Sequence, residues 1–238
     1  MAPSDLSRAI TDEQWTRAIE LARRFPKQAQ QWSKRQGFFE GRTVANVLPL
    51  HEAVVGNAPY DCVVAIVSAY PGALTALESS YQRLPLHCAC RKNADPRVVA
   101  FLIQQNKDSG LAPDSLGRLP IHYALSNGAD PAVIQVLMQA NPRMAKGMDL
   151  RGWMPLHVAA SMGASQGVVK TLLDAHPEAV LVKTKKGSSV TRCIPKHCPH
   201  RNDLKEMINE AREKVEGNVA LPSLERKSLE FDEHMVLV

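Results

Sequence analysis

Apolar residues recur along this chain at a spacing that is typical of a helix with one buried face. Within residues 131–140, four apolar side chains follow an i, i+1, i+4, i+5 pattern: Val133, Ile134, Leu137 and Met138. The first of these positions returns every 35 residues and holds valine each time, at Val63, Val98, Val133 and Val168. Self-similarity at such a period predicts a repeat architecture, in which one helical unit stacks on the next.

A tetrapeptide with proline second and histidine last precedes each of these helices. Its four copies are Leu48–His51, Leu84–His87, Leu119–His122 and Met154–His157. A proline in the first turn of a helix gives up no backbone hydrogen bond, so each copy predicts the start of a short helix. Asp95 and Asp130, each followed by proline, predict the N-caps of the longer helices, and Ser165 holds the same place one unit later. Each unit is therefore expected to contain a turn, a short first helix, a tight turn and a longer second helix.

The two ends of the chain depart from this pattern. Residues 15–24 predict a second helix with no first helix before it, and residues 33–43 predict an enlarged first turn. Near the other end, Leu204, Met207 and Ile208 keep the register of a second helix, whereas Pro195 shortens the helix before it. No periodicity remains after residue 216, which favours a flexible tail.

The expected organisation is an N-terminal segment (1–12), a repeat domain (13–216) and a flexible C-terminal tail (217–238). The repeat domain is expected to hold a half repeat (13–43), four full repeats (near 44–78, 79–113, 114–148 and 149–183) and a degenerate capping repeat (184–216).

The segment Asp149–Ala159, with the sequence DLRGWMPLHVA, resembles the unit of the ankyrin repeat family, Asp-x-x-Gly-x-Thr-Pro-Leu-His-x-Ala. The resemblance implies an all-α, ankyrin-type helical repeat solenoid whose helix-turn-helix units are joined by β-turn fingers. It also implies a non-catalytic protein that binds partners at the finger tips and the exposed side of the first helices. The family's threonine is replaced here by leucine or methionine, so the hydroxyl that usually bonds the motif histidine is missing.

Composition narrows the setting in which the chain works. Its net charge of +5 is mildly basic, a property that nucleic-acid binders share with many other proteins. The sequence shows no secretory signal and no apolar run long enough to span a membrane. Five cysteines, an odd number, favour reduced thiols. We therefore expect a cytoplasmic monomer without a membrane partner, with the nucleus as the alternative location.

Catalytic and metal-binding chemistry finds little support in the sequence. No motif of a hydrolase, a phosphate-binding loop, a zinc protease or a dinucleotide-binding turn is present. The motif histidines fall in separate repeats, about 10 Å apart, which is too far for one metal ion. We expect them to bond backbone in the turns between repeats.

A closer group of thiols and imidazoles leaves zinc as an alternative: Cys193, His197, Cys198 and His200. Ligands so close in sequence rarely complete a tetrahedron, although zinc accepts both kinds. We favour an incidental cluster in a degenerate repeat. Our expectation is a protein without enzyme activity, metal, cofactor or small-molecule substrate.

The expected partner-binding surface consists of basic, aromatic and apolar positions in the fingers and at the ends of the first helices. These residues are Tyr81, Arg83, Arg91, Lys92, Leu116, Arg118, Arg151, Trp153, Met162, Lys185 and Lys186. No acidic residue occupies the same positions, and Arg, Tyr and Trp often carry the binding energy of interfaces. We predict an adaptor, scaffold or inhibitor that binds an acidic segment of another protein.

Three alternatives to that prediction stay open. The basic face could bind nucleic acid, which we rank lower and which a steep salt dependence would reveal. The chain could be a regulatory fragment of a larger protein. The charges could also form no more than a solvated surface.

Overall fold

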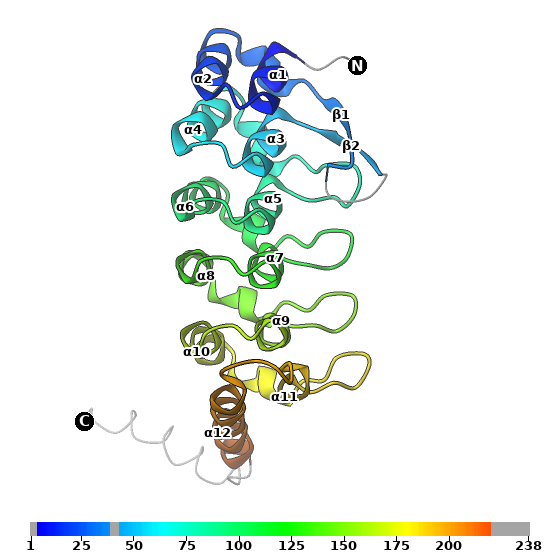
Figure 1. Ribbon diagram of the computed structural model, residues 1–238, viewed down its shortest axis with the longest axis vertical. Coiled ribbons are helices and arrows are strands. Elements are labelled where there is room, and N and C mark those ends of the chain that lie inside the picture. The colour runs from blue at the N-terminus through cyan, green and yellow to red at the C-terminus, as the bar shows by residue number, and fades with distance from the viewer. Residues whose placement is uncertain (1–3, 39–42, 220–238) are drawn as a thin grey trace, which may run out of the picture.

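The computed structural model describes residues 4–38 and 43–219 and shows one stack of helix pairs (Figure 1). The first helices form one column: α1 (Asp5–Thr11), α3 (Pro49–Val55), α5 (Pro85–Arg91), α7 (Pro120–Ser126), α9 (Pro155–Met162) and α11 (Val190–Cys193). The second helices form the other: α2 (Trp15–Arg24), α4 (Tyr60–Ala69), α6 (Pro96–Gln105), α8 (Pro131–Ala140), α10 (Gln166–Ala175) and α12 (Arg201–Val219). The all-α solenoid expected from the sequence is confirmed.

A short 3-10 helix follows each of the second helices α2 to α10 and leads the chain back toward the first column. These are η1 (Pro26–Gln30), η2 (Pro71–Thr75), η3 (Lys107–Gly110), η4 (Pro142–Lys146) and η5 (Pro177–Leu181). Four of the five begin with proline, whose fixed φ suits a first helical position and which needs no hydrogen-bond acceptor there. The prolines that end the second helices thus also begin the connecting turns.

The second helices begin at caps that the sequence supplies. Asp95 and Asp130 accept the backbone N–H groups of Arg97 and Ala132, each at 2.8 Å. Each bond satisfies one of the donors that a helix leaves open in its first turn. Ser165 stands at the same place before α10, but its side chain makes no such bond.

The tight turn between the two helices of a pair contains one residue in the left-handed conformation. Gly128 and Gly163 adopt φ of 64° and 62°, and Asn57 and Asn93 reach 52° at the equivalent places. Asparagine tolerates this region because its short side chain bonds locally. The Asn93 amide donates to the carbonyl of Asn127 at 2.9 Å and so links two successive turns.

Fingers project from the first column, and each later finger opens with a side chain that holds its turn together. The later fingers are residues 76–84, 111–119, 147–154 and 182–189, called fingers two to five. Asp149, at the start of finger four, accepts the backbone N–H groups of Arg151 and Trp153, both at 2.8 Å. The equivalent residues are Glu78, Asp114 and Thr184.

Backbone hydrogen bonds join each finger to the next. They run from Ser115 to Tyr81 at 2.9 Å, from Leu150 to Leu116 at 3.0 Å and from Lys185 to Arg151 at 3.0 Å. The fingers therefore form a ladder beside the two helix columns (Figure 1).

The enlarged first turn is a hairpin, finger one (residues 31–48), made of β1 (Ser33–Gln36) and β2 (Val44–Val47). The strands pair antiparallel, and the expected turn's residues 39–42 lie outside the described part. One face of the hairpin packs on α1 and α3 through polar groups. Glu52 accepts the Ser33 hydroxyl at 2.7 Å and forms an ion pair with Arg35, whose guanidinium also donates to Thr11 at 2.6 Å.

The N-terminal boundary expected from the sequence is wrong. Leu6, Ala9 and Ile10 are buried, and α1 packs against α2 and α3. The array therefore starts at residue 5, with a complete helix pair where a separate segment (1–12) and a half repeat (13–43) were expected. A seven-residue helix shows too little periodicity to be recognised from sequence alone.

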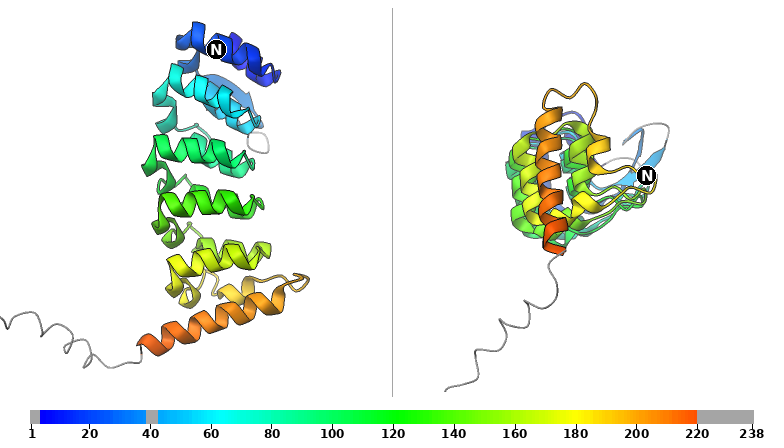
Figure 2. Two further views of the ribbon diagram at one scale, coloured as in Figure 1. Left: turned by 90° about the vertical axis from the view of Figure 1, so that its left-hand side faces the viewer. Right: turned by 90° about the horizontal axis from the view of Figure 1, so that it is seen from below.

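The C-terminal capping repeat has the predicted irregularity. The first helix, α11, spans only four residues and ends before Pro195, whereas α12 is the longest helix of the described chain. Figure 2 shows α12 lying across the end of the stack below α10. It runs to Val219, so residues 217–219 are helical and do not belong to a tail. The rest of the expected tail, residues 220–238, lies outside the described residues.

Candidate functional site

Each motif histidine joins two repeats inside the stack. Nδ1 of His87 accepts the backbone N–H of Leu84 at 3.2 Å, and its Nε2 lies 3.1 Å from the carbonyl oxygen of Arg118 in the next finger. The other copies make the same pair of bonds: His51, His122 and His157. Burial lowers the pKa of His51 and of His87 to about 4, so both are neutral near pH 7 and donate through Nε2. The predicted structural role of these histidines is confirmed.

Arg83 is not available to a partner in the way the sequence suggested. Its side chain is buried, where Nη2 donates to the Tyr123 hydroxyl at 2.7 Å and Nε lies 3.4 Å from Asp114. The Tyr123 hydroxyl in turn donates to Asp114 at 2.6 Å. This buried triad joins finger two to finger three and to α7. Arg83 therefore serves the stacking of repeats, because its charge is already compensated inside the protein.

The triad also shifts the pKa values of its members. Burial, followed by the bond to Asp114, raises the pKa of Tyr123 to about 12. Burial disfavours the ionised Asp114 carboxyl, but bonds from the Tyr123 hydroxyl and from backbone N–H groups outweigh it and hold its pKa below the usual value. Asp114 is therefore ionised opposite Arg83 near neutral pH.

The guanidinium of Arg118 is partly paired inside the protein and partly exposed to a partner. Its guanidinium lies 3.7 Å from the buried Asp149 and over the ring of Tyr123, while about 30% of its side chain is exposed. The positions selected from the sequence include no acidic residue because Asp114 and Asp149 stand near the starts of fingers three and four, just outside that set. The aspartate of the repeat motif could have revealed them.

A groove lies where fingers three and four meet α7 and α9, with a volume of about 200 Å³. Four predicted partner-binding residues line it together: Arg118, Arg151, Trp153 and Met162. The other lining residues are not among the predicted partner-binding residues: His122, Ser126, Asp149, Val158 and Ser161. Trp153 is half-buried with its ring 6.2 Å from that of His157, and Met162 is 51% exposed at the end of α9.

The remaining predicted residues lie outside this groove. Tyr81 and Leu116 are half-buried in their fingers, and the ring of Tyr81 stacks on the Arg83 guanidinium at 4.3 Å. Arg91 and Lys92 stand at the end of α5. Lys185 and Lys186 are exposed in finger five, beside Arg151 in the ladder. The predicted surface is thus a groove with basic residues on neighbouring fingers, without Arg83.

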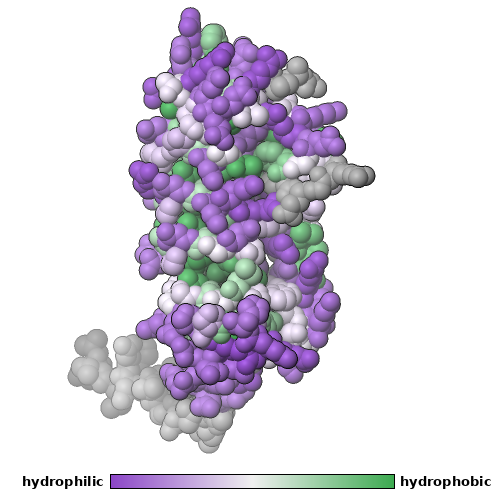
Figure 3. All heavy atoms as spheres, viewed as in Figure 1, coloured by the Kyte–Doolittle hydropathy of each residue, from purple (hydrophilic) through white to green (hydrophobic). Residues whose placement is uncertain are grey.

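Apolar surface is also present at this level of the stack. On the face shown in Figure 3, the two ends of the molecule are mainly hydrophilic, and apolar atoms gather between the pairs α7/α8 and α9/α10. Exposed apolar side chains at this level include Met162 and, in finger four, Met148 and Leu150. The groove therefore offers apolar contacts as well as charge.

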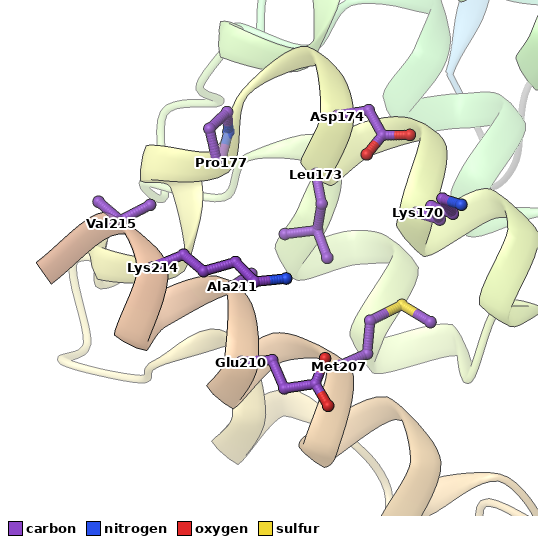
Figure 4. A pocket seen from close by; sticks show the side chains of 9 residues that line it. All are labelled: Lys170, Leu173, Asp174, Pro177, Met207, Glu210, Ala211, Lys214 and Val215. Atoms are coloured by element: carbon purple, nitrogen blue, oxygen red, sulfur yellow. The ribbon is translucent and has the colours of Figure 1, made fainter. Parts of the chain in front are cut away.

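A larger hollow, of about 430 Å³, lies between α10 and α12 (Figure 4). Leu173 and Met207 contribute apolar surface, and Lys170, Asp174, Glu210 and Lys214 surround it with both signs of charge. It contains none of the predicted partner-binding residues. The mixed charges give it no preference for an acidic or a basic ligand.

The Cys193–His200 segment does not gather into a metal site. Within the described ranges, no group of three or more His, Cys, Asp or Glu side chains is close enough to hold a metal ion. Cys198 is instead buried against the Gly163 turn. Nor does any helix in the described part have the length and apolar character that a membrane crossing needs.

Comparison with protein families agrees with this geometry. A model of three ankyrin repeats matches residues 50–145 and again residues 86–184, which together make up more than half of the chain. The chain belongs to the ankyrin repeat family. No curated protein matches it. The matched residues include α7, α9 and fingers three and four, so the groove lies within the ankyrin repeats themselves. Ankyrin repeats are protein–protein interaction modules and are typically non-catalytic.

Proposed function

We propose that this chain binds an acidic, partly apolar segment of another protein in the groove of fingers three and four. The observation that carries the proposal is the combination of Trp153, Met162 and Arg151 around one hollow. A half-buried tryptophan offers a large, rigid contact area, and Trp and Arg are the residues most often found at the energetic centre of interfaces.

The charges beside the groove favour an acidic partner. Arg151, Lys185 and Lys186 are exposed, and within the described residues no ion pair involves them. The backbone bond between Lys185 and Arg151 places these cations on adjacent fingers. A segment that crosses both fingers would bring its carboxylates to cations while an apolar side chain enters beside Trp153.

The test begins with affinity capture of partners by the intact chain, followed by calorimetry of the purified complex. Trp153→Ala should weaken binding by about thirtyfold, because a central aromatic anchor contributes about 2 kcal/mol. Arg151→Glu should weaken it by about tenfold, and less at high salt, because exposed charge pairs are weak and screened. Arg143→Glu is the matched control, since it changes the net charge equally from the exposed η4 turn.

Two outcomes would count against the proposal. Equal weakening by Arg143→Glu and Arg151→Glu would indicate a long-range charge effect without a defined groove. Binding that survives both groove substitutions would place the interface elsewhere.

Salt dependence separates protein binding from the nucleic-acid alternative. Nucleic acid should lose affinity steeply with salt whatever its sequence, because counterions are released from each contacted phosphate. An acidic protein segment anchored by Trp153 should lose much less. We further propose that the chain acts as a monomeric adaptor, scaffold or inhibitor in the cytoplasm or nucleus, a setting that suits its five free thiols.

A further inference from the structure

The outer edge of finger one carries backbone groups that point away from the hairpin. Gly37 donates to Thr43 at 3.0 Å, which makes them a hydrogen-bonded pair and fixes the alternation along the strands. With the register Lys34↔Asn46 and Gln36↔Val44, the peptide groups of Lys34 and Gln36 therefore face outward.

The opposite edge of the same hairpin shows what such groups do in this protein. Asn46, the partner of Lys34, turns its peptide groups away from β1 and bonds finger two. Its carbonyl accepts the backbone N–H of Ser79 at 3.3 Å, and its N–H donates to the Ser79 hydroxyl at 2.8 Å. Among the described residues, β1 has no such neighbour on its outer side, so it ends the ladder of fingers.

The solvent-facing side of the hairpin and the adjoining start of finger two expose three large apolar side chains. Trp32, Val44 and Leu77 are 39%, 54% and 46% exposed, although large apolar residues are mostly buried elsewhere in the stack. Trp32 and Leu77 line a hollow of about 380 Å³ together with Lys34. A tryptophan and a lysine thus stand beside an open strand edge.

We propose that β1 is a docking edge for an extended segment of a partner protein, which adds to the ladder as a further strand. Backbone bonds to Lys34 and Gln36 would supply affinity, and side chains on alternate positions would supply specificity. The partner segment carries an apolar residue that packs beside Trp32 and a carboxylate that pairs with Lys34. This surface is separate from the groove of fingers three and four, and it does not depend on the function proposed for that groove.

Proline substitutions test the backbone contact directly. The probe is a displayed library of short, linear, random peptides, selected on the immobilised full chain and then measured one by one. Lys34→Pro and Gln36→Pro each remove an outward N–H while leaving the bonds to β2 in place, as proline is tolerated on an edge strand. Lys34→Ala and Gln36→Ala are the matched controls, because they keep the N–H.

We expect the selection to yield a class of peptides in which β-branched or aromatic residues alternate with acidic ones. Each proline variant should weaken their binding by about tenfold or more relative to its alanine control. Trp32→Ala should weaken it as well, whereas Phe25→Ala, another exposed aromatic site, should not. Arg151→Glu, in the groove of fingers three and four, should leave the affinity of these peptides unchanged.

Three results would overturn it. The first is a selection that yields no peptide able to distinguish proline from alanine at either position while circular dichroism shows both variants folded. The second is a set of peptides that respond to Arg151→Glu and not to the proline variants. The third is a dimer of the chain, seen by sedimentation, that Gln36→Pro dissociates, since a second copy and not a partner would then occupy the edge.

Discussion

At the scale of single residues, the motif histidines are the links between repeats. Each accepts a backbone N–H through Nδ1 and donates through Nε2 to a carbonyl oxygen of the next finger. Only a neutral imidazole can make both bonds, because Nδ1 must carry no proton. The stack therefore depends on imidazoles that cannot take up a proton without losing a bond. Acid should weaken it before the carboxylates are protonated.

The stability of the fold should decrease below about pH 6.5. The folded-state pKa of His51 and of His87 is about 4, below the usual 6.5, so the unfolded chain binds more protons between those values. Their contribution is complete above pH 6.5 and is lost as the pH falls toward 4. Between about pH 7.5 and pH 5, each should lower the free energy of unfolding by about 2 kcal/mol, measured by urea titration.

Two glutamine variants check the source of that dependence. His87→Gln should reduce the loss of stability between pH 7.5 and pH 5 by about 2 kcal/mol and leave the share of His51 in place, whereas His200→Gln, at an exposed site outside the motif, should leave the profile unchanged. An unaltered profile in His87→Gln would contradict the assignment to the buried histidine.

Tyr123 is the centre of the buried triad, and its hydroxyl can be removed without changing its shape. Tyr123→Phe should lower the free energy of unfolding by about 1–3 kcal/mol, because Asp114 and Arg83 would both lose a bond in a dry site. Thermal or urea unfolding measures the loss. Tyr60→Phe is the control, since the half-buried Tyr60 packs on Phe101 and makes no hydroxyl bond within the described residues. An equal loss of unfolding free energy in Tyr123→Phe and Tyr60→Phe would show that the bonds of the triad do not stabilise the fold.

At the scale of elements, the turns of fingers three to five hold glycine, and in fingers three and four the missing side chain leaves room for the backbone of the next finger. Gly152 and Gly187 occupy equivalent turns with φ of 77° and 76°. A Cβ on Gly152 would stand 2.8 Å from the backbone nitrogen of Lys185, whereas one on Gly187 would meet nothing within 4 Å. The two sites therefore separate the cost of a left-handed turn from the cost of crowding the ladder.

Alanine at these two glycines should give unequal losses of stability. Gly187→Ala should cost about 1 kcal/mol, for the left-handed conformation alone. Gly152→Ala should cost about 1–3 kcal/mol more, since it also displaces the bond from Lys185 to Arg151. Urea unfolding of the two variants provides the measurement. A difference near zero would mean that the fingers separate without cost.

The helix pairs could be predicted from the sequence because their determinants are local. Valines at a constant period, aspartate caps and first-turn prolines all act within one unit. The hairpin could not be predicted in the same way, because residues 33–36 show no apolar alternation. One face of β1 is buried against Glu52 and Thr11, which α3 and α1 supply.

The candidate groove shows the same limit. Arg151 and Met162 could be placed from the repeat, since equivalent positions stay at least partly exposed. Arg83 could not, because its partners belong to the next repeat and Tyr123 has no counterpart in the other copies: the equivalent residues are Glu52, Cys88 and Val158. A single tyrosine that occurs in one copy of the motif thus explains why a predicted binding residue is buried.

At the scale of the whole molecule, contacts are between neighbours, and the two end units close the stack. Buried Leu6 in α1 covers one end, and Leu204 and Ile208 in α12 cover the other. Within residues 201–217, whose side chains the structure describes, a stripe of exposed polar residues forms the outer side of α12: Asn202, Glu206, Asn209, Glu213 and Glu216. A polar outer face on a terminal unit is what keeps a solenoid from growing by further stacking.

Because each unit touches only its neighbours, damage at one end should remain at that end. Ile208→Ala should cost about 2–5 kcal/mol by leaving a cavity under α12. In this variant, amide hydrogen exchange should become faster in α10 and η5 and stay unchanged in α2 and α4, since local unfolding spreads only to neighbouring units. Leu6→Ala is the mirror variant and should raise exchange at the other end. Mass spectrometry of both would decide the matter, and a uniform rise along the chain in either variant would show instead that the repeats unfold as one unit.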